Sequence, residues 1–235
     1  IPESVGGKEP QPAGSHIHDR IRTGTVVGKP LQLVDSNAKV TGQAWYGDDI
    51  RLTNETIGKI LRSPHHYAKI ISIDTTRVEA LPGVISVATG QDAPNRFGVL
   101  PVTKDEHAMS VEKVRHMGDL VACVCAETEA IAIEALALFD IEWEILEPVF
   151  DRKKGLEDVD EPIHWRGKYH LSRTNVQKRV FQEFGDRSLI ENPHAASHGK
   201  WSMEGVHHGF TEPHAVVAHW DPNGRLQLYT PQQVP

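Results

Sequence analysis

Apolar and polar residues alternate through much of residues 56–90, and this pattern predicts short strands. The segments TIGKILRSP and AKIISIDT have the alternation of half-buried strands, with a break between Ser63 and His65. The next segment, DTTRVEALPGV, starts with Asp and Thr residues that can cap a helix and stops at Pro82 and Gly83, so it predicts a short helix. VISVATG then indicates a further strand.

The best-formed unit lies between residues 115 and 150. GDLVACVCA is a nearly continuous apolar strand, and ETEAIAIEALALF has acidic residues in its first turn with Ala, Ile and Leu at helical spacing. DIEWEILEPV alternates again, which completes a strand, helix, strand unit. The unit is consistent with a βαβ crossover, and an antiparallel return stays open. We therefore expect an α+β domain over residues 38–150.

The flanking segments have a different character. Residues 1–37 are rich in Gly, Pro and Ser and predict an extended N-terminal arm, and residues 151–180 are charged and irregular and predict a linker. Within residues 181–235, the segments HGKWSMEG, PHAVVAHW and RLQLYT resemble strands. Pro222 and Gly224 lie at positions that favour a turn, so the last two strands predict a hairpin.

Charge and composition exclude some classes of function. The chain has 235 residues and a formal net charge of −7, without the clustered Lys and Arg that phosphate binding needs, so we expect no nucleic-acid partner. No apolar run is long enough for a membrane span and no signal-peptide pattern occurs, which predicts a cytoplasmic protein. Cys123 and Cys125 would point to the same face of a strand, a geometry in which they cannot easily form a disulfide with each other. We therefore expect buried, reduced thiols.

A cluster near the C-terminal end offers candidate chemistry. Imidazole and carboxylate groups suit zinc or non-heme iron, and His207, His208, Glu212 and His214 lie close together in the sequence. Their spacing differs from the helical HExxH pattern, and Pro213 constrains the chain between Glu212 and His214. We favour hydrogen-bonding structural roles over metal ligation, and a role beside an active site remains open.

Two further polar clusters could bind an ion, but each also has an ordinary structural explanation. Arg62 and Ser63 beside two histidines could bind a phosphate or carboxylate, but a solvated loop between strands is the blander interpretation. Asp35, Asp48 and Asp49 could bind a cation, although caps and turns are commoner roles for Asp. The sequence has no GxSxG, GxGxxG or P-loop motif, so it predicts neither a serine nucleophile nor a classical nucleotide-binding domain.

An ordered series of motifs resembles one enzyme family. KVTGQAWYGDDI, then GKILRSPHHYAKIISIDTTRVEALPGVISVATGQD, KVRHMGDLVACVCAETEAIAIEALALFDIEWEILEPVFD and VHHGFTEPHAVVAHWDPNGRLQLYTPQQ are similar to the N-terminal part of the molybdopterin-binding subunit of molybdenum hydroxylases, the xanthine dehydrogenase and aldehyde oxidase family. The resemblance covers residues 30–235. It implies an α/β hammerhead domain at 38–150 and the incomplete beginning of the first molybdopterin-binding domain at 181–235.

The resemblance also implies roles for residues near the C-terminal end. Gln233 matches the glutamine that hydrogen-bonds an oxygen ligand of molybdenum, and Gln232 and His208 are further expected cofactor contacts. Glu212 and His214 are expected to orient the scaffold beside the cofactor, and no residue is expected to ligate metal. The family's glycine-rich loop and general-base glutamate do not occur in this sequence, so we expect no catalytic residue within it and a role as a fragment or split subunit.

The expected cofactors and partners follow from the same resemblance. Molybdenum-molybdopterin, in its simple or its cytosine dinucleotide form, would be shared with the remainder of the subunit, and iron-sulfur clusters and FAD would lie on partner subunits. RFGVLPVTKDEHAMSVEKVRHMGD is most similar to the 4-hydroxybenzoyl-CoA reductase branch, so the substrate could be aromatic, heteroaromatic or a CoA ester, and the direction stays open. The alternatives are a noncatalytic assembly subunit with a hammerhead fold and a self-contained metal hydrolase.

Overall fold

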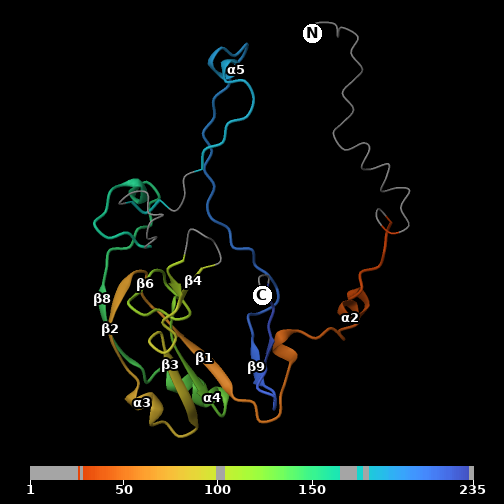
Figure 1. Ribbon diagram of the computed structural model, residues 1–235, viewed down its shortest axis with the longest axis vertical. Coiled ribbons are helices and arrows are strands. Elements are labelled where there is room, and N and C mark those ends of the chain that lie inside the picture. Colours follow the sequence, from red (N-terminus) through yellow and green to blue (C-terminus); the bar gives the residue numbers. More distant parts are fainter. Residues whose placement is uncertain (1–25, 27–28, 99–103, 165–173, 177–179, 233–235) are drawn as a thin grey trace. The chain divides into compact units, whose positions relative to one another are not determined.

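The chain divides into two compact units. The computed structural model describes residues 26, 29–98, 104–164, 174–176 and 180–232 (Figure 1). Unit 1 combines residues 1–51 with residues 205–235, and unit 2 comprises residues 52–204. Segments far apart in the sequence therefore form one unit around the C-terminal hairpin.

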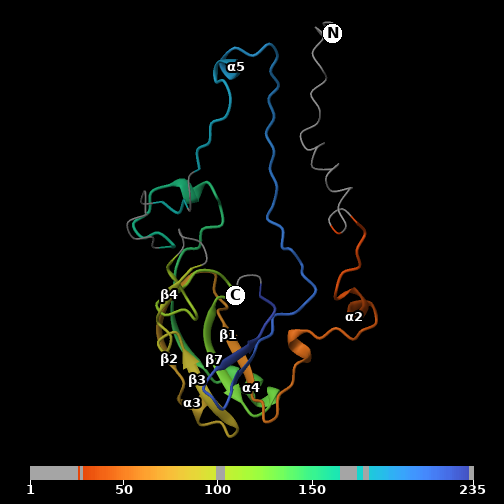
Figure 2. The same ribbon diagram turned by 45° about the vertical axis from the view of Figure 1, so that its right-hand side comes forward.

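The first sheet of unit 2 is antiparallel, with strands in the order β1 (Ile57–Arg62), β7 (Leu120–Ala126) and β3 (Val84–Thr89). Helix α4 (Glu129–Leu136) covers one face of this sheet, as Figures 1 and 2 show. Val124 and Ala126 of β7 pack there against Ala132 and Ala135 of α4 and against Val78 of the short helix α3 (Thr76–Glu79). This cluster forms the main core because small helical side chains let α4 approach the sheet closely.

The second sheet of unit 2 has the order β6 (Lys113–Val114), β2 (Ala68–Asp74) and β8 (Asp140–Ile145), again antiparallel. Its core contains Ala68, Val114 and Val121, with half-buried apolar side chains around them. Val121 belongs to β7, so one strand supplies apolar side chains to both cores of the unit. Unit 2 also contains a small strand pair, β4 (Arg96–Phe97) with β5 (Glu106–His107), and the short helices η2 (Lys154–Leu156) and α5 (Ser188–Glu191).

Unit 1 contains α2 (Ser36–Val40), the 3-10 turn η1 (Gly47–Asp49) and a hairpin of β9 (Val217–Trp220) and β10 (Leu226–Tyr229). The carboxylate of Asp221 closes the hairpin turn by accepting hydrogen bonds from the backbone N–H groups of Asn223 and Arg225, both at 2.8 Å. Gly224 has a φ of 79°, a conformation that favours glycine. The predicted hairpin is confirmed.

The structure confirms the predicted strands and helices of residues 56–145 and corrects two expectations. The strand, helix, strand unit is not a βαβ crossover, because β7 and β8 belong to different sheets. The expected strand HGKWSMEG at 198–205 does not form, and these residues are exposed with no ladder partner in the part of the chain that the structure describes. No helix among the described residues is long and apolar enough to cross a membrane.

The bounds of the two compact units differ from the segment bounds expected from the sequence. Residues 38–51 group with the C-terminal hairpin rather than with the sheets, and residues 151–204 group with the sheets. Most of the expected N-terminal arm and much of the expected linker lie outside the described residues.

Candidate functional site

In unit 1 the turn at Gly47 lies against the segment that leads to the expected cofactor residues. The backbone N–H of Gly47 donates to Glu212 Oε1 at 3.3 Å. A Cβ atom on Gly47 would lie 3.2 Å from Pro231 Cδ and 3.7 Å from Ala215 Cβ, which is tight against the proline. Glycine at this position therefore lets the turn pack directly behind Pro231, the residue before Gln232.

Local hydrogen bonds stabilise the turn η1 and the helix α2, which precede the contact of Gly47 with Pro231. Asp49 accepts a hydrogen bond from the backbone N–H of Tyr46 at 3.0 Å, and Asp35 lies 2.6 Å from Lys39 one helical turn later. The hydrogen bond from Lys39 lowers the pKa of Asp35, and Asp35 chiefly, with a smaller contribution from Glu212, raises the pKa of Lys39. The turn role expected for Asp49 is confirmed, whereas Asp35 occupies the N-cap position of α2 without a capping hydrogen bond from its side chain and pairs with Lys39 instead.

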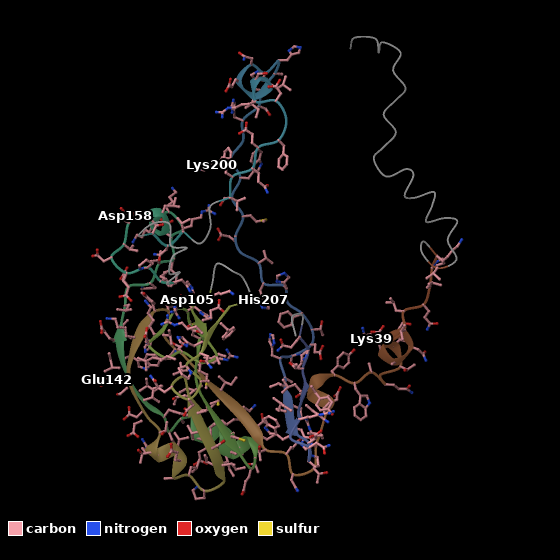
Figure 3. The ribbon with its side chains drawn as sticks, viewed as in Figure 1. Lys39, Asp105, Glu142, Asp158, Lys200 and His207 are labelled. Atoms are coloured by element: carbon pink, nitrogen blue, oxygen red, sulfur yellow. The ribbon has the colours of Figure 1, made fainter. Side chains whose placement is uncertain are left out.

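Two histidines of unit 1, His207 and His214, lie against the ring of Phe210. His207 Nδ1 accepts from the N–H of Gly209 at 2.9 Å, and the ring centroids of His207 and Phe210 are 5.6 Å apart (His207 is labelled in Figure 3). The Phe210 ring meets His214 edge-on at 4.9 Å. His208 is exposed. Among the described residues, no group of three or more His, Cys, Asp or Glu side chains is arranged to hold a metal ion.

Of the two expected glutamine contacts, Gln232 follows half-buried Pro231 and is exposed, whereas Gln233 lies outside the described residues. The structure thus brings Glu212 to the turn before this segment and leaves Gln232 and His208 open to a ligand. Amide, imidazole and backbone groups could hold a polar cofactor by hydrogen bonds without ligating its metal. Among the described residues, Gln232 and His208 are exposed groups of this kind.

Unit 2 contains a buried polar cluster that the sequence pattern did not reveal. The Asp105 carboxylate is 1% exposed, with Oδ1 3.2 Å from His164 Nδ1 and Oδ2 3.6 Å from Arg115 Nη2. Arg115 Nε also donates to the backbone oxygen of Ile163 at 3.0 Å. Asp105 lies at the end of the sheets that is farther from α4 in the view shared by Figures 1 and 3.

Contacts of Asp105, Arg115 and Lys113 hold residues 161–164 against the folded unit, so this part of the expected linker packs on it. Lys113 of β6 donates to Glu161 at 2.7 Å, and this pairing lowers the pKa of Glu161. Charged residues in an irregular stretch normally indicate solvated chain. Only the fold brings Asp105 and Arg115 next to that stretch.

The polar side chains of the loop after β1 donate hydrogen bonds to backbone oxygens of the protein itself. Ser63 is buried, its Oγ donates to the backbone oxygen of His65 at 2.9 Å, and Arg62 Nη1 donates to the backbone oxygen of Gly118 at 3.0 Å. The predicted loop between the two strands is confirmed, but its Ser63 is buried rather than solvated.

Both thiols are free and only half-buried, on the face of the first sheet opposite α4, which corrects the expectation of full burial. Burial still raises the pKa of Cys123, and Cys125 Sγ donates to Thr56 Oγ1 at 2.9 Å.

Comparison with known proteins identifies the fold of this chain. Residues 41–147 match the family model described as the aldehyde oxidase and xanthine dehydrogenase a/b hammerhead domain. The chain is 32% identical over 213 residues, 89% of its length, to the large molybdopterin subunit of nicotinate dehydrogenase from Eubacterium barkeri, and covers 48% of that protein. It is 32% identical over 215 residues, 88% of its length, to a probable xanthine dehydrogenase subunit of Bacillus subtilis, and covers 27% of it.

A solved structure agrees with this match. The aldehyde oxidoreductase of Desulfovibrio gigas superposes with a TM-score of 0.68 at 24% identity, over 84% of this chain and 23% of that protein, which shows a shared fold. The chain thus spans about half or less of the length of the relatives named here. In these proteins the matched segment is part of a much longer polypeptide.

Proposed function

This chain belongs to the aldehyde oxidase and xanthine dehydrogenase family, and we propose that it supplies the hammerhead domain and one wall of the cofactor site in a multi-subunit molybdenum oxidoreductase. The observation that carries the proposal is the close approach of Gly47 to Pro231, at a turn whose Gly47 N–H also donates to Glu212. This contact fixes the backbone immediately before Gln232 and Gln233.

In the proposal these two glutamines and His208 contact a molybdenum-molybdopterin cofactor, in either its simple or its cytosine dinucleotide form. When bound, that group carries out the two-electron oxidation or reduction of the substrate. The protein contributes orientation: Gln233 directs an amide hydrogen bond toward the cofactor, and His208 presents an exposed imidazole. Glu212 and His214 hold the surrounding chain and do not touch the metal.

Further subunits complete the proposed enzyme. The remainder of the molybdenum subunit would supply the general base, and partner subunits would carry iron-sulfur clusters and FAD that move electrons away from the cofactor. We propose a cytoplasmic complex that acts on an aromatic, heteroaromatic or CoA-linked substrate. Support comes from the names of the relatives, which are molybdopterin or dehydrogenase subunits.

The test is a glutamine substitution in the complex purified from its native source. We expect Gln233→Ala to lower turnover at least tenfold, because one missing hydrogen bond to a developing charge costs roughly that much or more. Gln227→Ala is the matched control, because Gln227 is an exposed glutamine on β10 of the same hairpin and is expected to have no effect.

Molybdenum content per complex separates loss of cofactor from loss of orientation. Wild-type turnover and molybdenum content in the Gln233→Ala complex would contradict the proposed contact and favour a noncatalytic assembly subunit.

A further inference from the structure

Among the described residues of unit 2, no helix packs on one face of the first sheet. Helix α4 and the core beneath it occupy the other face of this sheet. Because side chains alternate along each strand, two complete rows of residues paired across the three strands point to the face opposite α4. Val121 also points to that face and packs into the core of the second sheet. The rows consist of six residues: Gly58, Cys125 and Ser86 in the first, and Ile60, Cys123 and Ala88 in the second. We call these six residues the outer face.

The chemistry of the outer face differs from that of a solvated sheet. Antiparallel sheets that face water normally alternate apolar residues inside with polar residues outside. The second sheet of the unit carries an exposed ion pair, Lys69 with Glu144 at 3.1 Å, beside its exposed Ile71 and Ile145. The outer face carries no charged side chain, and its Ile60 is 44% exposed.

The outer face also has room for a close neighbour. A Cβ atom added to Gly58 would meet nothing within 4 Å, and both thiols are only half-buried. Small side chains in two adjacent rows allow the backbone of another element to approach closely. An uncharged surface of this kind is typical of the inside of an interface rather than of its rim.

We propose that the outer face is a docking surface for the polypeptide region that lies beyond the matched segment in the longer relatives. This inference rests on the proposed function, in which the rest of the molybdenum subunit binds this chain. The relatives support this occupant over a second copy, since the segment matching this chain makes up 48% of one relative and 27% of another. In those proteins a long stretch of the same polypeptide is available to cover the face.

Thiol footprinting tests the docking surface directly, because the chain has two cysteines and both lie on the outer face. The alkylation rate of each thiol by iodoacetamide at pH 8.5 would be measured by mass spectrometry in the isolated 235-residue chain and in the complex from the native source. We expect both rates to fall at least tenfold in the complex. Equal rates in the two samples would overturn the inference, as would full protection in the isolated chain.

A pair of substitutions separates this inference from the proposed function. Ile60→Asp places a charge on the outer face, and Ile71→Asp makes the same change at a 52% exposed position of β2 in the other sheet. We expect Ile60→Asp to weaken capture of the larger polypeptide at least tenfold and Ile71→Asp less than twofold, with both variants folded by circular dichroism.

Several results with the Ile60→Asp and Ile71→Asp variants would contradict the docking surface, and each leads to a different conclusion. If the wild-type chain captures the polypeptide and Ile60→Asp captures it equally well, the docking surface is wrong while the proposed function stands. Equal losses in both variants would also overturn the docking surface. A wild-type chain that captures no polypeptide and carries no molybdenum refutes the proposed function itself, and concentration-dependent dimerisation abolished by Ile60→Asp would assign the face to a second copy instead.

Discussion

Replacing Asp105 by Ala should destabilise unit 2 more than any single surface change. The carboxylate is 1% exposed and lies 3.2 Å from His164 Nδ1 and 3.6 Å from Arg115 Nη2. Removal of one partner from a buried ion pair costs about 3–5 kcal/mol, because the remaining charge loses its compensation. The side chains of Arg115 and His164 are 17% and 36% exposed, so water screens part of that loss.

We therefore expect a loss of about 2–3 kcal/mol in the free energy of unfolding of unit 2. For a unit of roughly 150 residues this corresponds to a fall of about 5–10 °C in the midpoint of thermal unfolding. Differential scanning calorimetry of the full chain measures it. Since residues 161–164 are held by the same cluster, limited proteolysis should also cut faster after residue 150 in the variant.

The matched control is Glu144→Gln, which removes an exposed ion pair with Lys69 on the second sheet. Exposed pairs contribute about 0–1 kcal/mol, so the control should stay within about 4 °C of the wild type. If Asp105→Ala unfolds at the same temperature as Glu144→Gln, the carboxylate does not stabilise the unit and the cluster is incidental.

Three further perturbations probe other parts of unit 2. Gly90→Ala would place a Cβ 2.4 Å from the backbone oxygen of Ser110, so we expect a loss of about 2–3 kcal/mol in urea unfolding. Lys113 lowers the pKa of Glu161, so this ion pair stabilises the fold above the ordinary glutamate pKa of about 4.3, and the stabilisation is lost as the pH falls through the lowered pKa. Lys113→Met should therefore make the free energy of unfolding less dependent on pH in the acid range. Burial raises the pKa of Cys123, so its alkylation rate in the isolated chain should rise at higher pH than that of a free cysteine.

Each has a control or a contrary outcome. Gly58→Ala, at an open position, should change stability by less than about 1 kcal/mol, and an equal loss at both glycines would contradict the steric argument. An unchanged acid limb in Lys113→Met, or a Cys123 rate profile that matches free cysteine, would refute the electrostatic and burial arguments respectively.

Local patterns predicted most elements of unit 2 because each depends on neighbours in the sequence. Alternation set β1 and β2, and the stop at Pro82 and Gly83 ended α3. The partition into two sheets was not predictable. It depends on which strands pair across long separations in the sequence, and β7 and β8, which are joined only through α4, pair with different partners.

The candidate site was predicted only in part. The turn and loop roles of Asp49 and Ser63 followed from their residue types, and the structure confirms both. Asp105 could not be found, because a buried carboxylate looks like any acidic residue until the fold brings its partners to it. The contact of Gly47 with Pro231 is equally invisible, since it joins residues at opposite ends of the chain.

The most direct test of the central claim is molybdenum content, measured together with mass spectrometry of every polypeptide that co-purifies with this chain from its native source. The account predicts one molybdenum per chain and a second, larger polypeptide that matches the remainder of the relatives. Absence of molybdenum, with no such polypeptide in the purified material, would contradict it and leave only a shared fold.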